Sequence, residues 1–182
     1  MSQEVIDRVT KLVWDFDKRV QAAPADAWTA DSPCDDWKAR DVAIHVTDNL
    51  SGVGNGLQGK EGKNVGPDDD IVAAWNEARD TFLGAVSSSD LSQTLPGPFG
   101  PMPAEQLIGR LISTDVLVHT WDLARATGGD EQLDQDAVAG AYSGLKPMDA
   151  MIRMPGVFGA KVDAPEGADL QTEFLCFLGR KV

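Results

Sequence analysis

Apolar residues recur every three or four positions through most of this chain, a spacing typical of amphipathic helices with one buried face. Pro24 lies just beyond the first of four long apolar-patterned stretches. A glycine in "ATGG" stands where the C-cap of the fourth stretch is expected. Shorter helices are expected over 134–153, where Pro147 should kink or restart the helix, and in "GADLQTEFLCFLG" after an extended segment, "VFGAKVDAP". The long stretches predict helices over about 2–22, 38–52, 69–87 and 104–127.

Segments rich in glycine and proline separate these helices. "SGVGNGLQGKEGKNVGPDDD" breaks the second helical pattern, and "LSQTLPGPFGPMPAE" cannot be helical throughout, so a small hairpin or a crossover loop is expected before the fourth helix. Five or six helices with little strand indicate an all-α bundle. We expect one domain over 1–182, with a core of about 1–128 and a short helical C-terminal extension of about 129–182.

Composition narrows the class of protein. The formal net charge of -13 disfavours binding to nucleic acid or to anionic membranes. No apolar run reaches the roughly 18 residues of a membrane span, and charges occupy the N-terminal positions where a secretory signal has its apolar core. Cys34 and Cys176 lack CxxC spacing, which indicates reduced thiols. We therefore expect a cytoplasmic protein.

The two histidines are the strongest chemical signal in the chain. Asp115 and His119 lie four residues apart in the fourth helix, so their side chains share one face. His45 lies in the second helix among apolar neighbours, and a buried imidazole needs polar partners. A metal held by His45, Asp115 and His119 would satisfy these groups. The alternatives are that Asp115 and His119 form a surface ion pair, or that both histidines are structural.

Two other features are weaker. "GNGLQG" matches the GxGxxG pattern, but it follows a helix instead of a strand and opens no helix, so dinucleotide binding is excluded. Cys34 has no histidine near it in sequence, and free cysteines are commonly buried, so nucleophilic catalysis is not expected there.

Two segments also resemble a known family. "SPCDDWKARDVAIHV" and "DVLVHTWDLARATG" are similar to the signature segments of the mycothiol-dependent maleylpyruvate isomerase family, in its metal-binding N-terminal domain. That domain belongs to the DinB-like superfamily of four-helix bundles, so the resemblance implies this fold. The closing "VFGAKVDAPEGADLQTEFLCFLGRKV" resembles the tail of short actinobacterial members.

The resemblance implies a metal site at matching positions. The family binds a divalent metal, usually zinc, through a histidine of the second helix and an acid-x-x-x-histidine of the fourth, which correspond to His45, Asp115 and His119. The isomerase has glutamate where this chain has Asp115, so its carboxylate lies one methylene closer to the helix. Nickel is the alternative metal. The isomerase also carries a sterol-carrier-like C-terminal domain for which 182 residues leave no room, so its reaction is not expected to carry over unchanged.

The expected chemistry follows from three protein ligands, which leave a coordination position open. In this superfamily, the resemblance implies, that position takes a low-molecular-weight thiol such as mycothiol. The chain is thus expected to be a metal-dependent thiol transferase or isomerase that acts on an electrophilic substrate; the alternative is a non-catalytic small-ligand-binding protein. The oligomeric state stays open: the resemblance makes a homodimer one possibility, because DinB-like bundles often dimerise, but no exposed apolar stripe in the sequence identifies a dimer face.

Three neighbours of the metal face receive provisional roles. Asp122 returns to the face of Asp115 and is assigned to catalysis as an acceptor for a ring N–H; the alternatives are that it faces water or pairs with Arg125. Arg125 is assigned to a substrate or thiol carboxylate, with the helix dipole as its alternative partner. Trp121 is assigned to the pocket mouth that receives the cofactor, with a core position as the alternative.

Overall fold

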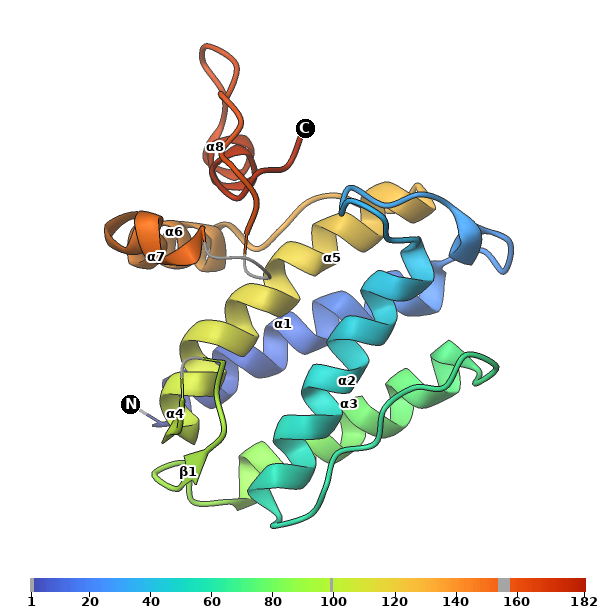
Figure 1. The fold of residues 1–182 in the computed structure, drawn as a ribbon, viewed down its shortest axis with the longest axis vertical. Coiled ribbons are helices and arrows are strands. Elements are labelled where there is room, and N and C mark those ends of the chain that lie inside the picture. The colour runs from blue at the N-terminus through green and yellow to red at the C-terminus, as the bar shows by residue number, and fades with distance from the viewer. Residues whose placement is uncertain (1, 99, 154–157) are drawn as a thin grey trace.

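Four long helices form a bundle in the computed structural model, which describes residues 2–98, 100–153 and 158–182 (Figure 1). Each helix contacts two others: α1 and α2 each lie against both α3 and α5. The apolar stripes meet in one core, which confirms the all-α bundle. The four helices are α1 (Ser2–Ala22), α2 (Ala39–Leu57), α3 (Ile71–Ser88) and α5 (Ser113–Thr127). The core includes the fully buried side chains of Val9, Phe16, Leu50, Trp75, Phe82, Val116 and Leu123.

Helix α2 continues past its predicted end. It runs on to Leu57 through glycines that the sequence pattern treats as a break. A Cβ atom on Gly54 would lie 2.8 Å from the Cα of Phe82 in α3. The glycine therefore permits close contact between two helices, and the packing of α2 on α3 outweighs the low helix propensity of this segment.

The segment before α5 contains a change of helical geometry. Helix α4 (Ala104–Gln106) passes into a π-helical turn, η2 (Leu107–Ile112), and then into α5. The Ser113 hydroxyl donates to the carbonyl of Ile108 at 2.8 Å across this wider turn. Gly128 ends α5 in the left-handed conformation with φ 71°, as expected for a C-cap glycine.

Short elements connect the long helices. A 3-10 turn, η1 (Ala27–Thr29), follows α1. Strands β1 (Thr94–Leu95) and β2 (Met102–Pro103) pair antiparallel before α4, with Thr94 opposite Pro103, which confirms a small hairpin at this place.

The C-terminal helices lie to one side of the bundle, beside α5 (Figure 1). They are α6 (Gln135–Leu145), a 3-10 turn η3 (Lys146–Met148), α7 (Asp149–Ile152) and α8 (Leu170–Phe177). The helix restarts around Pro147, as its missing N–H requires. Of the predicted extended segment, Val157 lies outside the described residues, and 158–165 are irregular. Among the described residues, no helix is both long and apolar enough to cross a bilayer.

Candidate metal centre and its cavity

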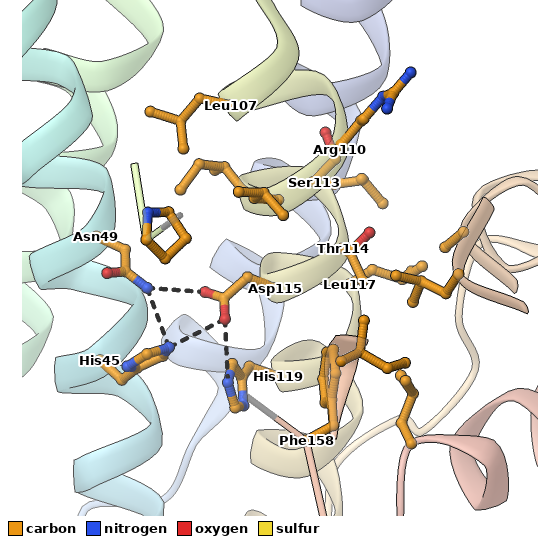
Figure 2. A pocket seen from close by; sticks show the side chains of 18 of the residues that line it. His45, Asn49, Leu107, Arg110, Ser113, Thr114, Asp115, Leu117, His119 and Phe158 are labelled. Carbon is orange, nitrogen blue, oxygen red and sulfur yellow. Dashed lines mark hydrogen bonds and ion pairs between the residues drawn. The ribbon is translucent and has the colours of Figure 1, made fainter. Parts of the chain in front are cut away.

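Helices α2 and α5 bring the two histidines together. His45 comes from α2, and Asp115 and His119 come from successive turns of α5 (Figure 2). Asp115 Oδ1 lies 3.0 Å from His45 Nε2 and 3.4 Å from His119 Nε2. One potential ligand atom from each residue lies within 4.8 Å of the others. The structure thus places two imidazoles and a carboxylate around one point.

An amide side chain completes the contacts of Asp115. Asn49 Nδ2 donates to Asp115 Oδ2 at 3.1 Å and lies 3.1 Å from His45 Nε2 (Figure 2). Asn49 stands four residues after His45, so both side chains leave the same face of α2. This spacing is the signal from which the sequence could have indicated Asn49.

The charged groups of the triad shift one another's pKa values. Burial alone would raise the pKa of Asp115, but the His119 charge and hydrogen bonds from both imidazoles hold that pKa well below its usual value of 3.8. Burial alone would lower the pKa of His119, but Asp115 and Asp122 raise it well above 6.5. The raised pKa of His119 favours its protonated imidazole, so metal binding at this residue would release a proton.

An aromatic ring covers one side of the triad. The Trp37 ring centroid lies 5.1 Å from that of His45 and 5.9 Å from that of His119, with an interplanar angle of 24° to the latter. The half-buried Trp37 limits the orientations of both imidazoles. Trp37 lies in the segment "SPCDDWKARDVAIHV", eight residues before His45, and this place in the segment is the signal from which the sequence could have indicated it.

Behind His119 lies a buried polar group. His119 Nδ1 donates to Asp122 Oδ2 at 2.9 Å, and Asp122 is fully buried. Arg180 Nη2 donates to the same oxygen at 2.7 Å, and Cys34 Sγ lies 3.3 Å from it. Burial alone would raise the pKa of Asp122, but His119 and Arg180 lower it to about 2. Asp122 therefore accepts a hydrogen bond from the His119 ring.

A second group of potential ligands exists here. Cys34, His119 and Asp122 also offer atoms within 4.8 Å of one another. The Arg180 guanidinium already supplies a positive charge to this group. Among the described residues, no lysine or arginine pairs with His45, Asp115 or His119, so this group is the better cation site.

Two residues assigned to the site lie elsewhere. Trp121 is 1% exposed, and the Arg125 guanidinium lies 4.8 Å from its ring centroid. Arg125 also pairs with Glu131 at 3.0 Å. Neither Trp121 nor Arg125 lines the cavity, because each lies roughly 200–240° around the helix from His119 at about 100° per residue. The structure thus places both away from the triad.

The triad opens into a cavity of about 1250 Å³. Its walls come from the bundle, the hairpin and the C-terminal helices, and many of them are apolar. Figure 2 shows Leu107, Leu117 and Phe158 on these walls, with the triad at one end of the group. This volume is ample for a small organic ligand beside a metal. The C-terminal helices contribute Ala137, Ala141, Leu145, Met148 and Ile152.

Comparison with known proteins identifies relatives of this chain. A family model described as "Mycothiol maleylpyruvate isomerase N-terminal domain" matches residues 9–124, which include the whole triad. Two proteins of Mycobacterium tuberculosis, "Uncharacterized protein MT0763" (strain CDC 1551 / Oshkosh) and "Uncharacterized protein Rv0738" (strain ATCC 25618 / H37Rv), are each 29% identical over 160 residues. The alignments cover 87% of this chain and 87% of each relative.

Two solved structures share the fold. The crystal structure of the mycothiol-dependent maleylpyruvate isomerase aligns with a TM-score of 0.62 and covers 76% of this chain and 67% of that one. A mutant of the mycothiol-dependent maleylpyruvate isomerase, in which one histidine is replaced by alanine, aligns with a TM-score of 0.65 and covers 84% and 72%. Sequence identity is 13% in both cases, so these likenesses show the fold alone.

Proposed function

Because the chain belongs to the mycothiol maleylpyruvate isomerase N-terminal domain family, we propose that it is a metal-dependent thiol transferase or isomerase. His45, Asp115 and His119 hold the divalent metal, and the adjoining cavity receives a low-molecular-weight thiol of the mycothiol type and an electrophilic substrate. The observation that carries this proposal is the convergence of the three ligand types at one end of a large cavity.

The donor set fits a catalytic metal. Two neutral imidazoles and one carboxylate suit zinc, with nickel as the alternative, and three protein ligands leave a position for an exogenous group. Asp115 reaches both imidazoles although its side chain is one methylene shorter than glutamate. The shorter carboxylate therefore does not prevent the three ligands from meeting.

When bound at such a site, the metal lowers the pKa of a coordinated thiol and favours its thiolate form. The protein's own residues orient the ligands. Asn49 engages Asp115 Oδ2 and leaves Oδ1 facing the two imidazoles. Asp122 accepts a hydrogen bond from His119 Nδ1, so His119 Nε2 faces Asp115. The Trp37 ring packs against both imidazole rings.

The proposal changes the roles assigned from the sequence. Asp122 is not among the residues that line the cavity, so it acts through His119 as a positioning residue and does not touch substrate. Arg125 and Trp121 have no role in the proposed chemistry. Trp121 instead anchors α5 in the core, with Arg125 stacked over its ring.

A second candidate function is non-catalytic binding of a small ligand, which the size and apolar walls of the cavity favour. Incubating the zinc-loaded protein with mycothiol and a panel of electrophiles separates the two. We expect catalytic thiol consumption that is lost in His45→Ala and retained in Asp80→Asn, an exposed acid of α3 that does not line the cavity. Saturable thiol binding without turnover would favour the binding protein, and equal turnover by His45→Ala would contradict the metal-dependent reaction.

A further inference from the structure

Arg180, the third residue from the C-terminal end of the sequence, contacts a buried acid of α5. Its Nη2 donates to Asp122 Oδ2 at 2.7 Å, and its Nε donates to Asp122 Oδ1 at 3.2 Å. The pair is thus bidentate, the arrangement that fixes both a guanidinium and a carboxylate in orientation. The side chain of Arg180 is 11% exposed, and that of Asp122 is fully buried.

The backbone after α8 is built to direct this side chain inward. Gly179 has φ 89°, in the left-handed region that favours glycine, and a Cβ there would lie 2.8 Å from the carbonyl oxygen of Ala160. The Arg180 N–H donates to the carbonyl of Leu175 at 2.9 Å, and its Nη1 donates to that of Leu178 at 3.1 Å. The turn and these bonds hold Arg180 against Asp122.

Asp122 transmits this contact to a proposed metal ligand. Its Oδ2 accepts from Arg180, from His119 Nδ1 and from the Cys34 thiol. An ionised carboxylate only accepts hydrogen bonds, so the proton on His119 Nδ1 is fixed and Nε2 is left to face Asp115. Without the guanidinium, the buried carboxylate would lack its principal counter-charge.

We propose that Arg180 is a positioning residue: through Asp122 it fixes the ring orientation and the tautomer of His119, so the C-terminal tail completes the metal centre. The inference rests on the proposed function, and Arg180 lies outside the 9–124 region that the family model matches. The same inference gives Cys34 and Asp122 the role of holding His119 in place. They do not form a second metal site, because the Arg180 guanidinium already supplies the positive charge there.

Zinc affinity, measured by competition with a chromophoric chelator, tests this role. We expect Arg180→Met to bind zinc about 10–100-fold more weakly than the wild type, the range typical of lost outer-shell partners. Arg180→Lys should recover part of the loss, because lysine keeps the charge but not the bidentate geometry. Arg153→Met is the matched control: Arg153 ties the same C-terminal segment through Asp149 and the Phe177 carbonyl without touching Asp122.

The outcomes separate this inference from the proposed function. Equal zinc affinity in wild type and Arg180→Met, or equal losses in Arg180→Met and Arg153→Met, would overturn the positioning role. A wild type that binds no zinc would overturn the proposed function first. Should Arg180→Met fail to fold, nitrogen-15 spectra of the zinc-loaded wild type provide the test. A proton on His119 Nδ1 with the metal on Nε2 supports the inference. A proton on Nε2 with the metal on Nδ1 overturns it.

Discussion

At the scale of single residues, three buried or half-buried aspartates do different work. Asp115 faces the cavity and two imidazoles, and Asp122 supports His119 from behind. Asp17 lies in the bundle far from this chemistry and accepts from Trp75 Nε1 at 2.8 Å, from Gln21 at 3.1 Å and from Arg79. The same side chain type is thus a candidate ligand, a positioning group or a purely structural acceptor, according to its partners.

Asp17 gives a pH-dependent stability prediction. Burial raises its pKa, but hydrogen bonds from Trp75, Gln21 and Arg79 outweigh burial and lower the pKa below 3.8. A folded pKa below the unfolded value means that the contribution to stability is present above about pH 4 and is lost as pH falls through the folded pKa. We expect Asp17→Asn to lower the free energy of unfolding by about 2 kcal/mol at pH 7, with the difference narrowing below pH 4.

Urea denaturation at pH 7 and pH 3 measures that difference. The control is Asp80→Asn, which removes another partner of Arg79, but one whose side chain is 67% exposed. Its effect should stay within about 0.5 kcal/mol, as for other exposed ion pairs. A penalty for Asp17→Asn that is the same at both pH values would show that the ionised carboxylate contributes nothing specific.

At the scale of elements, two glycines of α2 have different effects on stability: one permits close contact with α3, and the other only lowers the helix propensity. Gly54 is buried against the backbone of Phe82, whereas Gly52 is exposed, and a Cβ there would meet no atom within 4 Å. We expect Gly54→Ala to lower the free energy of unfolding by about 2 kcal/mol through overpacking. Gly52→Ala should raise it by about 0.5–1 kcal/mol, because alanine favours the helix.

Chemical denaturation of the two variants, whose substitutions lie two residues apart in the same helix, provides the comparison. Opposite signs are expected. A Gly54→Ala protein as stable as Gly52→Ala would contradict the close approach of α2 and α3, and with it the reason why α2 continues to Leu57.

The elements also show what sequence periodicity predicts well. The positions of α1 and α3 follow from apolar spacing, because their contacts come from regular stripes. The end of α2 depends on tertiary contact with Phe82, and the π-helical turn η2 on a local change of hydrogen bonding. Neither the end of α2 nor the turn η2 changes the spacing of apolar residues, so neither could be predicted from that spacing.

At the scale of the whole molecule, the site joins parts of the chain that are distant in sequence. The spacing of Asp115 and His119 and the matching segment around His45 are visible in the sequence, so the triad could be predicted as a unit. Arg180 lies 58 residues from Asp122, and its contact depends on the turn at Gly179. Trp121 and Arg125 are adjacent to the triad in sequence, yet helix rotation places them elsewhere.

Bound metal, measured by elemental analysis of protein purified without a histidine tag, tests the central claim most directly. The wild type and Asp80→Asn should each hold about one equivalent of zinc or nickel after incubation with that metal. His119→Ala should lose it while keeping its helical circular dichroism, because His119 lies at the cavity and its removal leaves the apolar core intact. No bound metal in the wild type, or about one equivalent retained in His119→Ala, would contradict the metal centre.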